Sequence, residues 1–147
     1  MLKRMEMEPI TPDIMLNKIN ASLSREVLTH HVVRKALTYL EDHIPNLDSR
    51  FFTVVHGDVN HNNWLLSDRD ELYLVDWEGA MIADPAIDIG MLLYNYVPQS
   101  KWSKWFDTYG LEESINLNKR MKWYTVIQSN GMFQWYDEQK QYKDINM

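Results

Sequence analysis

The sequence contains no cysteine, which excludes disulfides, thiolate nucleophiles and cysteine-ligated zinc sites. This composition fits a reducing compartment, and we expect a cytoplasmic protein. Its five glycines are scattered along 147 residues, so the sequence holds no Gly-rich phosphate-binding loop. No apolar run approaches the roughly 18 residues of a membrane span, and the first residues lack the apolar core of a signal peptide. We therefore expect no interaction with a membrane.

Basic residues are outnumbered by acidic ones, 15 against 21, and the net charge is −6. Non-specific nucleic-acid binding needs a basic face, so we expect no nucleic-acid partner. An anionic substrate would need a metal ion or a local basic group. The length suits a single domain over residues 1–147. Six Trp and eight Tyr indicate large aromatic surfaces that are buried or used in binding.

Helix signals begin at Thr11-Pro12-Asp13, where a capping hydroxyl, a first-turn proline and an acidic residue predict a helix to about residue 20. Ser24 predicts the cap of a second helix that ends at Pro45. The predicted buried stripe of this second helix comprises Leu28, Val32, Ala36, Tyr39, Leu40 and Ile44.

Short apolar runs rich in Val and Leu predict buried strands at 51–55 and 72–75. A short extended segment at 64–66 is expected to pair with 72–75 as a hairpin across a polar turn. Further along, a central helix over 84–97 is apolar nearly all round and is expected to be buried. Helices over 100–140 follow. Gly110 is expected to end the first, and Asn130-Gly131 is a candidate break in the second.

Polar side chains flank the predicted strands. Asp58 and Asn63 follow the first strand, and Asp76 ends the strand at 72–75. Because a strand sets the direction of the groups at its ends, these three side chains can converge on one point. Carboxylate and amide oxygens suit Mg²⁺ and a phosphate ester. Asp76 should be partly buried, where a carboxylate is costly without a partner, so it is the best single metal-ligand candidate.

Each of these residues also has a plainer interpretation. Asp58 can accept a hydroxyl proton, or it can cap local backbone N–H groups in a turn. Asn63 can bind metal and brace the aspartate, or it can be an ordinary loop asparagine. Asp88 lies inside the buried helix and needs donors, which we expect from backbone N–H groups of residues 56–60. We therefore expect Asp88 to hold the 56–60 loop in place and not to take part in the reaction.

Histidines near Asp58 raise a rival chemistry. His56 and His61 can be ligands in a metal-dependent phosphoesterase, whose ions are held by His and Asp from several loops. Such a site needs further histidines downstream, and none occurs after His61. We interpret His56 instead as packed against the loop beneath Asp58, and His61 as an exposed loop residue or a phosphate contact.

Three motifs in order resemble one family. The pattern H-G-D-x₄-N at 56–63, followed by D-W-E at 76–78 and D-P-x-x-D at 84–88, is similar to the aminoglycoside phosphotransferase and choline kinase group. Bacterial choline- or thiamine-kinase-like members look closest. The Asp-x₄-Asn spacing also matches the protein-kinase catalytic loop. The resemblance covers most of residues 10–140 and is strongest at 52–97.

The resemblance implies an α+β, protein-kinase-like fold: a mostly helical C-terminal lobe with a small β-hairpin that carries the catalytic loop. That loop would span 54–66, the metal-binding strand end 72–78, the central helix 84–97 and the C-terminal helices 100–140. The implied activity is ATP-dependent transfer of a phosphoryl group to the hydroxyl of a small molecule resembling choline, thiamine or an aminoglycoside.

The resemblance also assigns roles to residues. Asp58 would position and deprotonate the acceptor hydroxyl, and His56 and Asp88 would support the catalytic loop. Asn63 and Asp76 would hold Mg²⁺ on the phosphates of ATP. Trp77 and Glu78 are candidate substrate contacts. Other tryptophans can line a pocket for a cationic or flat acceptor, or they can pack in the core, which is the plainer interpretation of each. They are Trp102, Trp105, Trp123 and Trp135.

Two features depart from the family pattern. Asn60 stands where relatives carry a lysine or histidine, so it supplies no positive charge to the transferring phosphoryl group. The residues before position 50 also lack the strand lysine and partner glutamate of an N-terminal lobe. We therefore expect a C-terminal lobe alone, with the N-terminal lobe missing and the chain inactive by itself.

The apolar surface that such a lobe would expose predicts self-association. A non-catalytic binding or scaffold module with this fold is the alternative.

Overall fold

The computed structural model describes residues 8–47 and 51–129, and within them the chain is mostly helical with two small antiparallel sheets. The helices are α1 (Pro12–Ser22), α2 (Arg25–Leu28), α3 (His31–Asp42), α4 (Ala86–Tyr96), α5 (Trp102–Thr108) and one over residues 115–129. The strands are β1 (Thr53–Val55), β2 (Trp64–Leu66), β3 (Leu72–Leu74) and β4 (Met81–Ala83). The expected α+β class is confirmed.

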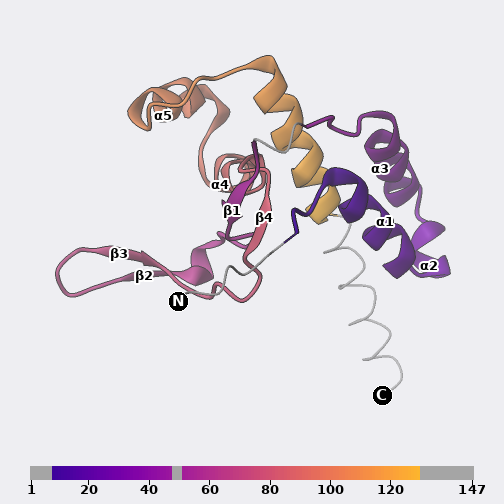
Figure 1. Cartoon of the computed structure of the whole chain (residues 1–147), viewed down its shortest axis with the longest axis horizontal. Coiled ribbons are helices and arrows are strands. Elements are labelled where there is room, and N and C mark those ends of the chain that lie inside the picture. The colour runs from indigo at the N-terminus through magenta and orange to yellow at the C-terminus, as the bar shows by residue number, and fades with distance from the viewer. Residues whose placement is uncertain (1–7, 48–50, 130–147) are drawn as a thin grey trace, which may run out of the picture.

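Figure 1 shows how these elements are arranged. Helices α1, α2 and α3 lie on one side, and the helix over 115–129 separates them from the β1–β4 pair and α4. The β2–β3 hairpin projects away from the body on the opposite side, below α5. In the part of the chain that the structure describes, no helix is both long and apolar enough to cross a membrane.

Local capping defines the helix starts. The Thr11 hydroxyl accepts from the Ile14 N–H at 3.3 Å, and the Ser24 hydroxyl accepts from the Val27 N–H at 3.2 Å. Both predicted caps are confirmed. Ser114 plays the same part for the helix over 115–129, accepting from the Leu117 N–H at 3.0 Å. These bonds satisfy N–H groups that have no partner inside the helix.

The predicted single helix from Ser24 to Pro45 is wrong. Helix α2 ends after one turn, because Thr29 bonds back to Glu26 through both its N–H and its hydroxyl, and His30 is extended. The break rotates the buried stripe, which now comprises Val33, Leu37 and Leu40, while Val32 is 71 % exposed. A break of this kind resets the helical phase by about one residue.

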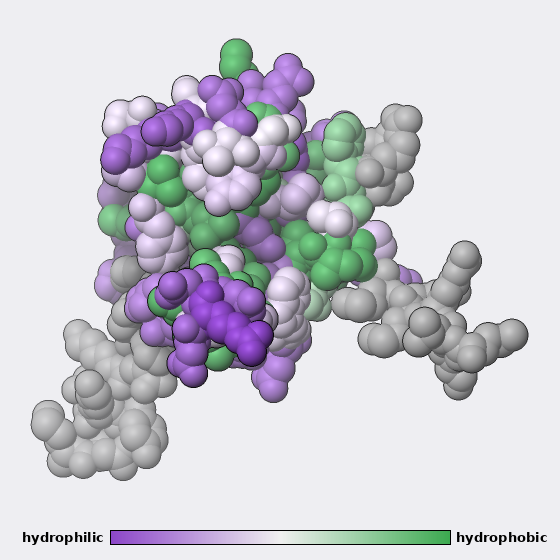
Figure 2. All heavy atoms as spheres, turned by 90° about the vertical axis from the view of Figure 1, so that its left-hand side faces the viewer, coloured by the Kyte–Doolittle hydropathy of each residue, from purple (hydrophilic) through white to green (hydrophobic). Residues whose placement is uncertain are grey.

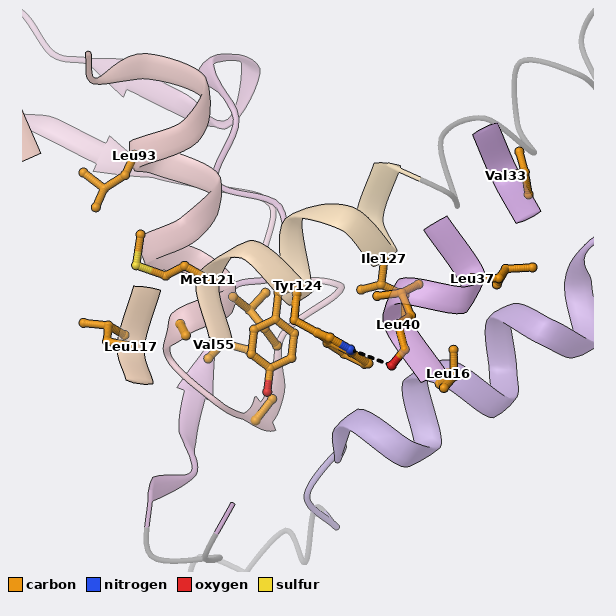
Figure 3. Close-up of a cluster of buried hydrophobic side chains, with 14 of the residues drawn as sticks. Leu16, Val33, Leu37, Leu40, Val55, Leu93, Leu117, Met121, Tyr124 and Ile127 are labelled. Carbon is orange, nitrogen blue, oxygen red and sulfur yellow. Dashed lines mark hydrogen bonds between the residues drawn. The ribbon is translucent and has the colours of Figure 1, made fainter. Parts of the chain in front are cut away.

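The core lies between α3, α4 and the helix over 115–129 (Figure 3). Met121, Trp123 and Tyr124 of the last helix are completely buried, and the Trp123 Nε1–H donates to the Leu40 carbonyl at 3.0 Å. Leu117 and Ile127 of this helix are buried as well. Met132, Trp135 and the break predicted at Asn130-Gly131 lie outside the described residues.

The strands differ from their predicted burial. The hairpin forms as expected, with Trp64 opposite Leu74 and Leu66 opposite Leu72, but Leu72, in a strand predicted to be buried, is 62 % exposed. Strand β1 pairs with β4, and its Val54 is 59 % exposed whereas Val55 is buried. The predicted burial of β1 and β3 is therefore wrong for most of their residues and correct for Val55.

Helix α4 is also less buried than its composition indicates. Ile87, Gly90 and Leu93 are buried, whereas Tyr94 and Tyr96 are exposed. The helix packs one face on the core and leaves the other beside the hairpin and α5.

Candidate active site

Asp88 anchors the loop that follows β1. Its two carboxylate oxygens accept from the backbone N–H groups of His56 at 2.8 Å and Gly57 at 2.9 Å. The backbone donors expected for this carboxylate are thus present. Gly57 has φ of +85°, and a Cβ there would lie 3.2 Å from the Met81 side chain. Only glycine fits this turn without strain.

His56 is 1 % exposed and ties the loop to the segment after β3. Its Nδ1 accepts from the Asp58 N–H at 3.1 Å, so the ring proton is on Nε2, which donates to the Val75 carbonyl at 2.7 Å. The edge of the ring meets Trp77, with centroids 4.7 Å apart. His56 therefore connects the backbone of Asp58 to the segment that precedes Asp76. It packs against the loop beneath Asp58, which is the position predicted for it.

Asp58 is exposed, and two amides hold its carboxylate. The Asn60 side-chain amide donates to one oxygen, and the Asn63 Nδ2 donates to the other at 3.2 Å and to the Asp58 carbonyl at 2.7 Å. These bonds fix the direction of an otherwise free carboxylate. The Asn63 amide nitrogen is used in this way, which leaves its Oδ1 as the acceptor atom of the side chain.

Asp76 lies beside Asn63 because the hairpin ladder continues past β3. The Val75 N–H donates to the Asn63 carbonyl at 2.8 Å, one step beyond the Trp64–Leu74 pair. Asp76 has φ of +62° and is exposed, so the prediction that it is partly buried is wrong. Among the described residues its carboxylate has no hydrogen-bond or ion-pair partner.

The donor set of this site is composed of oxygen. No group of three or more His, Cys, Asp or Glu side chains is placed to hold a metal ion within residues 8–47 and 51–129. The candidate ligands are instead the Asp76 carboxylate and the Asn63 amide oxygen, with the Asp58 carboxylate next to them. Oxygen ligands of this kind fit Mg²⁺, which keeps several of its waters and takes few protein ligands.

Trp77 and Glu78, the candidate substrate contacts, lie on the turn after Asp76. The Trp77 Nε1–H donates to the Leu74 carbonyl at 2.8 Å, and its ring braces His56. Glu78 is exposed on the same turn. Both side chains therefore border the site, with Trp77 also a structural part of it.

Asp84 carries a buried cluster that sequence reasoning missed. Its completely buried carboxylate accepts from the Ala86 N–H at 2.9 Å, from Arg120 Nη1 at 2.6 Å and from the Tyr124 hydroxyl at 3.0 Å. Burial, and then the neighbouring carboxylate, raise the pKa of Tyr124 far above 10.0. The one available signal was the four-residue spacing of Arg120 and Tyr124, which places them on one helix face.

Comparison with known families identifies this arrangement. A model of the phosphotransferase enzyme family, known as APH, matches residues 5–124. The chain belongs to this family.

Two solved structures show the same kinase-like fold. A macrolide 2'-phosphotransferase type I matches with 20% identity and a TM-score of 0.57, over 85% of this chain and 43% of its own. A spectinomycin phosphotransferase in complex with ADP and spectinomycin matches with 11% identity and a TM-score of 0.62, over 90% of this chain and 47% of its own. The chain thus spans less than half the length of either phosphotransferase.

A cavity opens on the hairpin side of this phosphotransferase-family domain. It has a volume of about 510 Å³ and lies against the 56–63 loop through His61. Its other lining residues are Trp64, Leu72, Leu92, Tyr96, Val97, Trp105 and Tyr109. Of the tryptophans expected to line a pocket, Trp105 is in this lining, whereas Trp123 is completely buried in the core. Trp102 is buried as well, and Trp135 lies outside the described residues.

Proposed function

We propose that this chain carries the acceptor-activating and metal-binding half of an ATP-dependent phosphotransferase that acts on the hydroxyl of a small molecule. The observation that carries the proposal is the exposed Asp58 carboxylate, held by two amides. One of these amides belongs to Asn63, whose backbone carbonyl accepts from the Val75 N–H, next to the unpartnered Asp76 carboxylate. Family membership supports phosphotransfer. The ADP named in the spectinomycin phosphotransferase complex supports ATP as the donor.

Asp58 acts as the base in this proposal. The acceptor oxygen attacks the γ-phosphorus, its proton passes to an Asp58 carboxylate oxygen, and the bond to the bridging oxygen of ATP breaks to release ADP. Asn60 and Asn63 keep the carboxylate directed at the acceptor, so the geometry is in place before the substrate arrives. His56 and Asp88 hold the backbone from which Asp58 projects.

The Asn63 Oδ1 and the Asp76 carboxylate would hold Mg²⁺. The ion supplies charge neutralisation to the phosphates when bound. Asn60 cannot add a positive charge, so the proposal assigns more of this neutralisation to the metal site than a basic residue at position 60 would require. The acceptor itself belongs to the proposal: choline-like, thiamine-like and aminoglycoside-like alcohols all carry a suitable hydroxyl.

Metal and nucleotide binding tests the proposal. Mn²⁺ is titrated into the full chain in the presence of ATP, and binding is followed by water-proton relaxation. We expect Asp76→Asn to weaken Mn²⁺ binding at least about tenfold. Asp68→Asn, on the exposed hairpin turn, is the matched control and should bind as the parent does. Equal affinity in the Asp76→Asn variant, or no binding of Mn²⁺ to the parent, would contradict the assignment of the metal site.

A further inference from the structure

The cavity beside the hairpin has aromatic walls on three elements. Trp64 and Leu72 line it from the hairpin, and Leu92 and Tyr96 line it from α4. Trp105 of α5 and Tyr109, which directly follows α5, complete this part of the lining. The hairpin register explains which side chains take part: Trp64 and Leu72 lie on one face, while Leu65 and Tyr73, paired with each other, lie on the other. Figure 2 shows weakly polar and apolar side chains between the polar hairpin tip and α5.

Hydrogen bonds join this cavity to the loop that bears Asp58. The Tyr96 hydroxyl accepts from the His61 N–H at 2.8 Å and lies 3.2 Å from His61 Nδ1. The Trp64 Nε1–H donates to the Val59 carbonyl at 3.2 Å. Tyr96 and Trp64 are therefore hydrogen-bonded to the two neighbours of Asn60 in the loop. The side chain of Asn60 in turn donates to the Asp58 carboxylate. A ligand in the cavity lies next to the 56–63 loop.

The lining restricts what this ligand can be. Among the described lining residues there is no Asp, Glu, Lys or Arg. A polycationic amino sugar would lose its hydration here without gaining a carboxylate partner, which is costly. A quaternary ammonium group can lie on an aromatic face without a carboxylate, but it gives up more hydration free energy on entering this cavity than an uncharged ring does. A neutral ring loses little hydration and gains contact with several aromatic faces, and the volume suits a small-molecule site.

Resting on the proposed phosphotransfer at Asp58, we propose that this cavity binds the uncharged, ring-bearing part of the acceptor. The acceptor is then a neutral alcohol whose ring lies between the hairpin and α5 while its hydroxyl extends past His61 toward Asp58. The cavity selects against polycationic amino sugars and quaternary ammonium alcohols.

Fluorine NMR of the full chain labelled with 5-fluorotryptophan tests this proposal. Trp64→Phe and Trp105→Phe assign the two lining resonances, and Trp123, completely buried in the core, is the internal reference. The neutral compound is 2-phenylethanol, and choline and kanamycin are the cationic compounds. We expect saturable shifts of Trp64 and Trp105 with 2-phenylethanol, no shift of Trp123, and weaker effects of both cations.

Two lysine variants make the test site-specific. Leu72→Lys places an ammonium group at the cavity wall and should weaken binding of 2-phenylethanol at least about tenfold, because the charge must stay hydrated. Leu65→Lys adds the same charge on the opposite hairpin face and should leave the affinity within about twofold. Both leucines are more than half exposed, so neither change removes core packing.

Three outcomes would overturn the proposal: tighter binding of choline or kanamycin than of 2-phenylethanol, no saturable shift of either lining tryptophan, or equal weakening by both lysine variants. The experiment contains no nucleotide or metal. Its failure therefore leaves the metal test at Asp76 standing, and failure of that test leaves the assignment of a neutral ligand to this cavity standing.

Discussion

Asp88 uses both carboxylate oxygens on adjacent backbone N–H groups, those of His56 and Gly57. In an Asp88→Asn variant an amide nitrogen would face one of these donors, leaving it without an acceptor. We expect a loss of about 1–3 kcal/mol in the free energy of unfolding, measured by urea denaturation. Asp68→Asn, an exposed change of the same chemistry, should cost almost nothing; an equal loss in both variants would show that Asp88 does not brace the loop.

The role of a residue can be predicted from sequence where its local chemistry determines what partners it needs. The donors to Asp88 were predicted, although His56 and Gly57 are 32 and 31 residues away, because a carboxylate inside an apolar helix must find partners. The Asp84 cluster was missed because no motif of the sequence links Asp84 to Arg120 and Tyr124, which are 36 and 40 residues away. Asp76 was predicted to be partly buried from its apolar neighbours, yet the hairpin that carries them stands clear of the body.

Helix α4 and the helix over 115–129 lie close together at Gly90. A Cβ at this position would lie 3.1 Å from the Met121 carbonyl oxygen and 3.3 Å from its Cα. Backbone cannot move aside as a flexible side chain can, so Gly90→Ala should destabilise the protein by about 1–3 kcal/mol, although alanine favours helix by about 1 kcal/mol. Thermal unfolding measures this, with Asn17→Ala on the exposed face of α1 as the control. A more stable Gly90→Ala protein would contradict the close packing.

The ends of helices were predictable where the residues at the end itself determine them. Thr11, Ser24 and Gly110 mark helix ends through their own backbone and side-chain bonds, and Gly110 has the expected positive φ of +66°. The break at Thr29 was not predictable from the apolar spacing, which continues through it. Strand β4 was absent from the prediction because its pairing with β1 joins residues about thirty positions apart, such as Thr53 and Ala83. Sequence patterns of period two or 3.6 carry no information on such pairing.

Asp84 and Tyr124 form a buried hydrogen-bonded pair whose contribution to the stability of the domain depends on pH. Burial and the Asp84 carboxylate raise the pKa of Tyr124 in the folded protein. The unfolded chain therefore releases this proton first, and its contribution to stability is complete below the ordinary pKa of 10.0. Above that pH the free energy of unfolding should fall by up to about 1.4 kcal/mol per pH unit. Tyr124→Phe removes the titrating group, so its slope between pH 10 and 11 should be shallower; equal slopes would contradict the coupling.

Self-association is the prediction that belongs to the molecule as a whole. The chain spans less than half of the two similar phosphotransferases, and its hairpin exposes Leu65 and Tyr73 on one face. Both edges of this two-stranded sheet are open in the part that the structure describes, and unpaired apolar strands favour pairing with another chain.

We expect sedimentation velocity at micromolar concentration to show a concentration-dependent dimer. Leu65→Lys should shift it toward monomer, because it sets a charge in the contact. Ile115→Lys, at the start of the helix over 115–129, is the control and should not, since Ile115 is exposed but lies outside the hairpin. A parent chain that sediments only as a monomer would contradict the proposed association.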